Sequence, residues 1–324
     1  MSKRIMLLFV ICSVFLLHII IGSPAYAEDI PEPGLEKALA KADAFNAWMR
    51  ERTDQEIADE MGIPVRLVLS PYGTDAPPEP LITASEGDSW DDLVHRLLEK
   101  YGAEEESVGI GYYNTATGEE HYMNPDQYMV SASMFKVPLN MIFADIISSG
   151  EMALDTDIWG MPYSWYQYKS IVESDNERSH TLMQYLGGYI PFKEQQIPYL
   201  GNDPREDLGP AYNSDNYYNA RQFIHLLRML YDEPARFPGI LENMLQAEPY
   251  SYFHQYERRY PIAQKYGFVQ QEESYRGFHT YINTCGIVFA DQPFCIVMFT
   301  DNVSLAYDLI SEFCMVMCDY SNPV

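Results

Sequence analysis

The placement of strand-like and helix-like segments along the chain limits its fold more than any other feature. The strand-like runs fall in two groups, one near the start of the chain and one near its end, at residues 108–113, 120–123, 262–269, 281–289 and 294–300. Between these groups, apolar residues recur mostly at helical spacing. Strands from both ends are therefore expected to pair in one sheet. The pattern predicts an α+β fold with helix and sheet layers. An antiparallel sheet is built from the N- and C-terminal thirds and flanked by helices, and an all-helical subdomain covers about residues 133–260.

The first 27 residues have the features of a secretory signal peptide. Lys3 and Arg4 precede an apolar run over residues 5–21, and Ala25-Tyr26-Ala27 provides a small-x-small cleavage site. We expect a secreted, extracytoplasmic protein with no stable membrane insertion after cleavage. An uncleaved membrane anchor is the alternative, because the apolar run is nearly long enough to span a bilayer.

The charge of the chain restricts its partners. The formal net charge of −26 becomes −28 without the two basic residues of the signal segment. Such a surface repels a phosphate backbone, so no nucleic-acid partner is expected. A small-molecule substrate or cell-wall material fits better, and we expect a monomer.

The cysteines and histidines do not form the patterns of a disulfide framework or a metal site. Cys285 and Cys295 lie in apolar strand-like runs, while Cys314 and Cys318 lie in a helix-like run, so buried free thiols are predicted. No metal-ligand spacing occurs among the histidines. The sequence predicts no metal and no cofactor.

The region before the main domain differs from it in composition. Residues 35–61 show the spacing of an amphipathic helix, and residues 71–80 are rich in proline, as in a linker. Ser89-Trp90-Asp91-Asp92 resembles a capping box that starts a new helix. We therefore predict an extension over residues 28–88 and a catalytic domain over residues 89–324.

A candidate nucleophile lies where a short polar run becomes apolar, at Val130-Ser131-Ala132-Ser133-Met134-Phe135-Lys136. A helix that begins near Ser133 would direct its unpaired N–H groups toward the hydroxyl. Lys136 follows three residues later on the same face. A lysine in this position, partly desolvated and near the positive helix end, has a lowered pKa and can accept the serine proton.

Two further motifs follow in the order Ser174-Asp175-Asn176 and Lys265-Tyr266-Gly267. The set Ser-x-x-Lys, Ser-Asp-Asn and Lys-x-Gly resembles the signature of the class A β-lactamases and penicillin-binding proteins, from about Ser89 to the end of the chain. The first triplet is followed by a helix that ends in Gly187-Gly188. A second triplet, Ser214-Asp215-Asn216, is not followed by a helix with such an end. We interpret it as a loop and helix cap.

The resemblance implies a role for each motif. Ser133 would attack an amide carbonyl and form an acyl-enzyme, with Lys136 as proton acceptor and Ser174 as the relay to the leaving nitrogen. The N–H groups of Ser133 and Phe268 would form the oxyanion hole. Substrate binding would use Asn176 and the strand residues Lys265, Tyr266, Gly267 and Phe268.

Two departures from the family pattern bear on the substrate and on release of the product. Tyr266 replaces the threonine or serine that helps to bind a substrate carboxylate. The family's Glu-x-x-Leu-Asn pattern, whose glutamate activates the deacylating water, is not met. The nearest candidate base is Glu194, and Glu206 and Asp207 are the other candidates.

Three functions remain open at this point. The first is a β-lactamase-like hydrolase that opens a β-lactam or similar amide. The second is a D,D-peptidase or another penicillin-binding-type hydrolase that acts on peptidoglycan peptides with slow deacylation. The third is a non-catalytic wall-binding protein, and the intact Ser133, Lys136, Ser174 and Lys265 argue against it.

Overall fold

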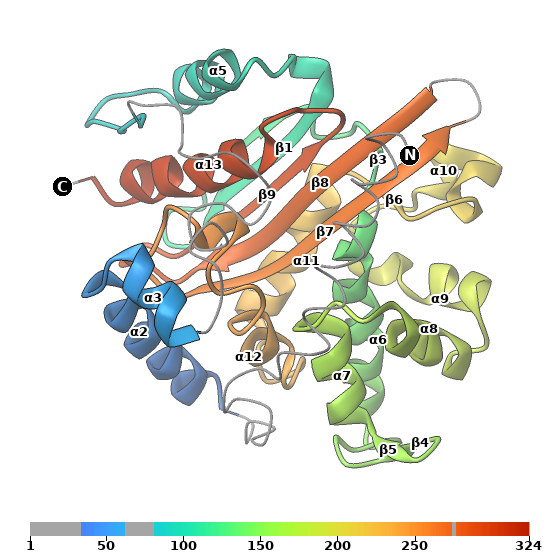
Figure 1. Cartoon of the computed structure of the whole chain (residues 1–324). Coiled ribbons are helices and arrows are strands. Elements are labelled where there is room, and N and C mark those ends of the chain that lie inside the picture. The colour runs from blue at the N-terminus through green and yellow to red at the C-terminus, as the bar shows by residue number, and fades with distance from the viewer. Residues whose placement is uncertain (1–33, 62–80, 274–276, 324) are drawn as a thin grey trace, which may run out of the picture. The chain divides into compact units, whose positions relative to one another are not determined.

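A five-stranded antiparallel sheet runs through the described part of the chain (Figure 1). The structure, a computed structural model, describes residues 34–61, 81–273 and 277–323. In spatial order the strands are β2 (Glu120–Met123), β1 (Val108–Asn114), β9 (Phe294–Thr300), β8 (Gly277–Val288) and β7 (Ile262–Glu273). The N-terminal strand β1 pairs with the C-terminal strand β9 from Val108 opposite Thr300 to Asn114 opposite Phe294. The prediction that the two ends of the chain share one sheet is confirmed.

Two helices cover one face of this sheet. Helix α5 (Trp90–Tyr101) and helix α13 (Ala306–Ser321) pack on each other and share an apolar core with the sheet (Figure 1). Helix α5 begins as the sequence predicts, because the Ser89 side chain accepts a hydrogen bond from the Asp92 N–H. It ends at Gly102, whose φ of 59° is the left-handed conformation typical of helix ends.

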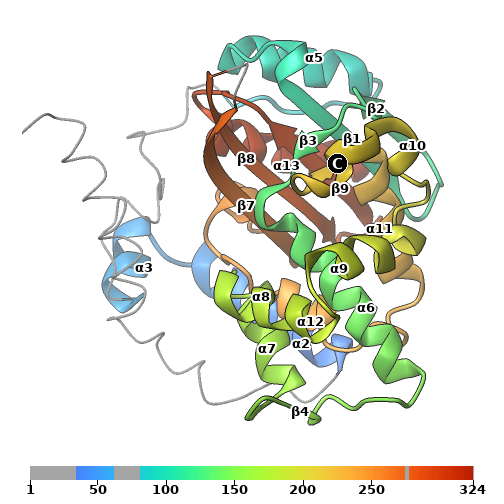
Figure 2. The ribbon, with the colours of Figure 1, turned by 90° about the vertical axis from the view of Figure 1, so that its right-hand side faces the viewer.

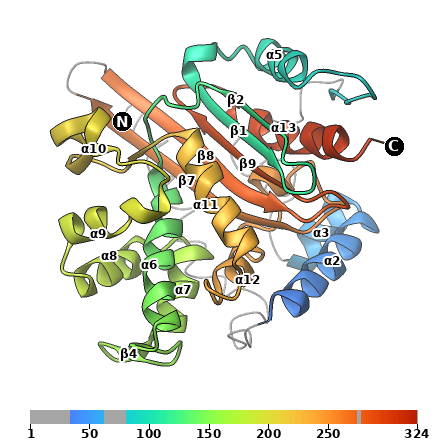
Figure 3. The same ribbon diagram turned by 180° about the vertical axis from the view of Figure 1, so that it is seen from behind.

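A second apolar core lies on the opposite face. Helix α11 (Ala220–Asp232) packs against β1, β8 and β9, as Figure 3 shows from behind. The other helices of this region are α6 (Lys136–Ser148), α7 (Tyr163–Ile171), α8 (Asn176–Tyr185), α9 (Tyr189–Gln195), α10 (Arg205–Leu208) and α12 (Ile240–Met244). Figure 2 shows α6, α7, α8 and α12 below the sheet, while α10 lies level with its strands.

Short elements connect these helices. Two small antiparallel pairs join β3 (Met129–Val130) to β6 (Tyr217–Tyr218), and β4 (Asp157–Ile158) to β5 (Met161–Pro162). The 3-10 turns are η1 (Glu105–Ser107), η2 (Ala132–Phe135), η3 (Ile197–Tyr199), η4 (Gly209–Asn213) and η5 (Tyr252–His254).

The segment expected as one helix over residues 35–61 is two helices, α2 (Leu35–Arg50) and α3 (Asp54–Met61). The break comes at Thr53. The Thr53 hydroxyl accepts from the Glu56 N–H at 3.3 Å, while the Glu56 carboxylate accepts from the Thr53 N–H at 2.8 Å. This reciprocal capping box, which was not predicted, starts a new helix. Helix α2 is attached to the main region, since the Asn46 amide donates to the Tyr260 carbonyl at 2.7 Å.

Several predictions concern the chain ends and the thiols. In the described ranges, no helix has both the length and the apolar character needed to cross a membrane. The predicted signal peptide and the proline-rich segment over residues 71–80 lie outside the described residues. Cys285, Cys295, Cys314 and Cys318 are buried and free, which confirms the prediction for the thiols.

Candidate active site

The candidate nucleophile Ser133 lies in the 3-10 turn η2, and helix α6 begins three residues later at Lys136. Ala132, directly before the serine, has a φ of 50°. A residue with a side chain in this conformation costs about 1–3 kcal/mol, and such strain persists where the surroundings enforce it. The enforcing contacts come from both sides. The Ser131 N–H donates to the Asn216 carbonyl at 2.9 Å, and the Asn283 amide donates to the Val130 carbonyl at 2.8 Å.

Strand β7 passes directly against this turn. A Cβ atom added to Gly267 would lie 2.7 Å from the Ser131 carbonyl oxygen and 2.8 Å from the Ser133 nitrogen. Only glycine permits so close an approach. The approach brings the backbone of Ser133 next to that of Gly267 and Phe268, the two segments that the sequence analysis assigned to the oxyanion hole.

Lys136 is fully buried, with 0% of its surface exposed. Its Nζ donates to the Ser174 carbonyl at 2.5 Å, to the Ser174 Oγ at 3.1 Å and to the Asn176 Oδ1 at 2.8 Å. Burial lowers the pKa of Lys136 to about 7, against a smaller opposing effect of the Asp175 charge. A neutral lysine able to accept a proton is therefore abundant near neutral pH. Among the described residues, no side chain forms a hydrogen bond with the Ser133 hydroxyl, and Lys136 is directed toward Ser174 instead.

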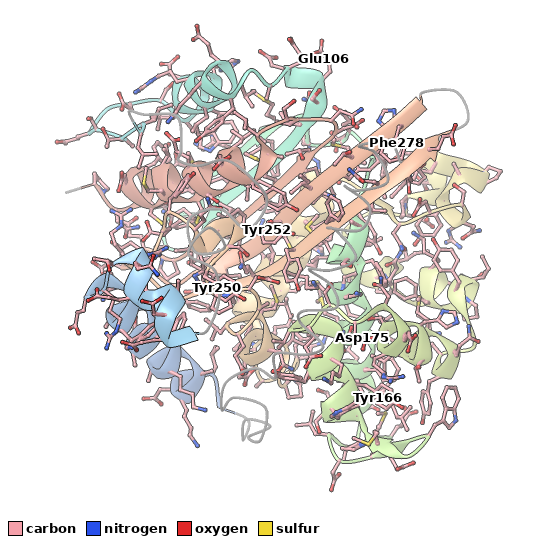
Figure 4. All side chains as sticks on the ribbon, in the orientation of Figure 1. Glu106, Tyr166, Asp175, Tyr250, Tyr252 and Phe278 are labelled. Carbon is pink, nitrogen blue, oxygen red and sulfur yellow. The ribbon has the colours of Figure 1, made fainter. Side chains whose placement is uncertain are left out.

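Ser174 lies between two lysines. Its Oγ is 3.1 Å from Lys136 Nζ and 2.9 Å from Lys265 Nζ. Ser174 has a φ of 54°, so it is, like Ala132, a residue other than glycine in the strained left-handed conformation. The next residue, Asp175, caps helix α8 by accepting from the Arg178 N–H, which gives it a structural role. Figure 4 labels Asp175 at the start of this helix.

Lys265 comes from strand β7 and is also fully buried. Its Nζ donates to Ser174 Oγ and, at 2.9 Å, to the Tyr266 carbonyl. Burial is the main reason that the pKa of Lys265 lies well below its ordinary value, and the charge of Lys136 adds to the effect. The centre of the Tyr266 ring lies 3.8 Å from Lys265 Nζ.

The structure does not bring Glu194 to this group. Glu194 is exposed on α9, while its neighbour Lys193 points inward and is fully buried. Within the described chain, neither Lys136 nor Ser174 has a hydrogen bond or ion pair with Glu194. The other two carboxylate candidates lie on α10, where Asp207 accepts from the Tyr128 hydroxyl at 2.9 Å and Glu206 is exposed.

The second Ser-Asp-Asn triplet has a structural role. The Ser214 hydroxyl donates to the Ala211 carbonyl, and the Asn216 carbonyl holds the turn before Ser133. The cap of helix α11 is Asn219, not a residue of the triplet.

Sequence reasoning missed two buried asparagines that hold the site in place. Asn283 joins β8 to the segment before Ser133, and it accepts from the Thr300 N–H at 2.9 Å. Asn140 donates to the Lys136 carbonyl at 2.8 Å and to Ser170 Oγ at 3.1 Å. The signal was present, because each is an amide side chain inside an apolar run, and a buried amide needs partners.

Metal ligands do not cluster in this region. Over the described residues, no group of three or more histidine, cysteine, aspartate or glutamate side chains is arranged to hold a metal ion.

Comparisons with known proteins identify the family of this chain. A family model described as "Beta-lactamase enzyme family" matches residues 91–314. No match was found among curated proteins.

Solved structures of β-lactamases share the fold. The chain is similar to the TLA-3 extended-spectrum β-lactamase, with 16% identity and a TM-score of 0.59 over 72% of this chain and 99% of that one. A β-lactamase from Chitinophaga pinensis has 18% identity and a TM-score of 0.58 over 72% and 99%. A β-lactamase from Burkholderia vietnamiensis has 14% identity and a TM-score of 0.57 over 74% and 100%. With the match of the family model over most of the chain, the protein belongs to the β-lactamase enzyme family, whose members are serine hydrolases of the kind that its motifs indicated.

Proposed function

We propose that this protein opens a β-lactam or a similar amide through an acyl-enzyme on Ser133. One observation carries the proposal: three motifs distant in sequence meet at the hydroxyl of Ser174, which lies within 3.1 Å of both Lys136 and Lys265. The two lysines are fully buried, and a buried amine is expensive unless it is used or fully paired. Two strained residues, Ala132 and Ser174, belong to the same group.

The contacts support a sequence of proton transfers. Neutral Lys136 removes the Ser133 proton, and the serine oxygen attacks the carbonyl carbon of the substrate. The N–H groups of Ser133 and Phe268 stabilise the oxyanion that forms. When the carbon–nitrogen bond breaks, the leaving nitrogen takes the proton of the Ser174 hydroxyl, and the Lys136 ammonium returns a proton to Ser174. The proton taken from Ser133 thus reaches the leaving group, and the acyl group stays on the serine.

Release of the acyl group needs an activated water, and here the observations favour slow deacylation. Among the described residues, no carboxylate forms a hydrogen bond or ion pair with Lys136, and Glu194 faces solvent. A site without a carboxylate base retains its acyl group. This supports the slow deacylation of the second candidate function, a penicillin-binding-type hydrolase.

The proposed location and assembly state rest on the sequence alone. The cleavable N-terminal segment supports secretion, with an uncleaved membrane anchor as the alternative, and a monomer that takes a small substrate is the simplest assembly.

The test mixes the protein with a chromogenic cephalosporin, supplied as the free acid and as its methyl ester, and follows colour and intact mass. We expect a burst of about one product per enzyme and a persistent adduct. Sustained turnover without an adduct would instead show rapid deacylation by a base that we have not identified. If neither form leaves an adduct or produces colour, the acyl-enzyme proposal is contradicted.

A further inference from the structure

The ring of Tyr266 occupies the space beside the Lys265 amine. In the resemblance stated above, this lysine and a small hydroxyl residue bind a carboxylate of the substrate. Here the lysine is 0% exposed, and the centre of the Tyr266 ring lies 3.8 Å from its Nζ. A carboxylate must come within about 3 Å of an ammonium to form a charge-assisted hydrogen bond. The ring therefore takes up part of the space within which such an anion would have to lie.

The Tyr266 ring is also held by aromatic packing. It stacks on the ring of Tyr252 with centroids 4.8 Å apart, and Tyr252 in turn meets Tyr307 edge-on at 5.2 Å. Figure 4 labels Tyr252 close to the sheet. Stacked aromatic pairs of this kind add stability beyond the area they bury. Displacing the ring to admit an anion would break this packing.

At its other end the Tyr266 side chain reaches the segment that carries Ser174. The Tyr266 hydroxyl lies 3.5 Å from the Val172 carbonyl, two residues before the serine. The side chain thus crosses from strand β7 to the turn between α7 and α8. The ring lies beside the lysine, whereas Ser133 is partly exposed.

We propose that Tyr266 is a specificity-determining residue that closes the carboxylate position, so that the site acylates substrates with no carboxylate beside the scissile amide. The inference rests on the acyl-enzyme function proposed above and names its substrate class: amides or esters that are neutral next to the reacting carbonyl. Burial of Lys265 acts in the same direction, because its lowered pKa favours a neutral amine that attracts no anion.

The test compares second-order acylation rates, measured by intact mass, for benzylpenicillin and its methyl ester. These two compounds differ in the carboxylate alone. In the wild-type protein we expect the ester to react faster by about tenfold or more, because the carboxylate of the free acid would lose its water on binding and gain no partner, a penalty that the neutral ester does not have. The variant Tyr266→Thr, which removes the ring and adds a small hydroxyl, should reverse this preference. The matched control Tyr266→Phe keeps the ring and should keep the preference for the ester.

The outcomes separate this inference from the function on which it rests. Adducts with both compounds and a faster reaction of the free acid would overturn the role of Tyr266 while supporting the acyl-enzyme. An unchanged preference in Tyr266→Thr would overturn it as well. No adduct with either compound would contradict the acyl-enzyme itself, and the inference would fall with it. The wild-type comparison needs no variant, so a variant that does not fold still leaves the inference falsifiable.

Discussion

At the scale of single residues, the decisive property of the site is the burial of its lysines. Lys136 and Lys265 are both completely enclosed, and both are bound to the same hydroxyl. Two ammonium groups so close in a dry site repel each other and lack the water that stabilises charge. At least one of them is therefore neutral near neutral pH, which is the state that a base requires.

The rate of acylation should depend on pH through Lys136. Its pKa of about 7 means that the neutral form increases as the pH rises through 7. Because the neutral amine is the proton acceptor, we expect the acylation rate to rise by about tenfold from pH 6 to pH 8 and then to level off. Stopped-flow measurement with the faster of the two penicillin forms would show the inflection.

The control is Lys193, whose pKa is likewise lowered to about 7 by burial but which lies outside the catalytic group. The variant Lys193→Met should keep the inflection near pH 7. A rate that is constant from pH 6 to pH 8.5, or an inflection that disappears in Lys193→Met, would show that Lys136 is not the group that titrates.

The set of residues that meet at the candidate site could be predicted from the sequence, but their contacts could not. The order of the three motifs was enough to select Ser133, Lys136, Ser174 and Lys265, which the structure brings together. The direction of Lys136 toward Ser174 depends on rotamers and on a chain segment 38 residues away. The outward direction of Glu194 depends on which face of α9 is buried, and one short helix carries too few residues to indicate it.

At the scale of secondary structure, the contact between strand β7 and turn η2 assembles the site. The strand provides Lys265 and Phe268, the turn provides Ser133, and Gly267 lets them touch. Register along β7 is fixed by twelve residue pairs with β8, so the position of Gly267 relative to the turn is not adjustable.

Replacing Gly267 by alanine should separate these elements. Its Cβ would lie 2.7 Å from the Ser131 carbonyl oxygen, closer than such atoms approach, so the turn must move. We expect acylation to fall at least about 100-fold, the effect of a displacement of roughly 1 Å at the reacting atoms. Intact mass against time gives the rate.

The matched control is Gly109→Ala on strand β1, where the nearest atom to an added Cβ is 3.5 Å away. This substitution should leave the acylation rate within about twofold. Equal effects of the two substitutions would show that β7 does not position Ser133.

Helix starts show what local sequence can and cannot reveal. The capping residue Ser89 predicted the start of α5, because its partner Asp92 is three residues away. The same logic applied to Thr53 and Glu56 would have divided the N-terminal helix correctly. By contrast, the sequence predicts a helix start at Ser133, where the structure has a 3-10 turn, because the strain at Ala132 is imposed by distant Asn216 and Asn283.

At the scale of the whole molecule, pairing of the two chain ends could be predicted from element types, since strands at the ends must find partners. The order β2-β1-β9-β8-β7 and the assignment of helices to the two faces could not. These depend on long-range packing, to which each residue contributes little.

The buried lysines also affect the molecule as a whole, because each one is neutral in the folded state and charged in the unfolded state.

Stability should therefore rise with pH between 7 and about 9.5. The pKa values of Lys136 and Lys193 are about 7 in the folded protein, against an ordinary value of 10.5. Between these values the unfolded chain binds one more proton per lysine, so lowering the pH favours unfolding. Each lysine contributes up to about 1.4 kcal/mol per pH unit to the slope. Urea unfolding at several pH values measures it.

The substitution Lys193→Met removes one of these lysines. It should reduce the slope of the unfolding free energy against pH by up to about 1.4 kcal/mol per pH unit. Lys193 donates to the Asp215 carbonyl at 3.2 Å and lies over the Tyr212 ring, so methionine retains most of the apolar packing. A stability that is flat or decreasing from pH 7 to 9.5 would contradict buried neutral lysines.

The central claim is that Ser133 carries the acyl group, and the most direct measurement is the site of the adduct. After reaction with the penicillin methyl ester, proteolysis and mass spectrometry should place one acyl group on the peptide that contains Ser133. The variant Ser133→Ala should acquire none. An adduct on another residue, or labelling that persists in Ser133→Ala, would contradict the account.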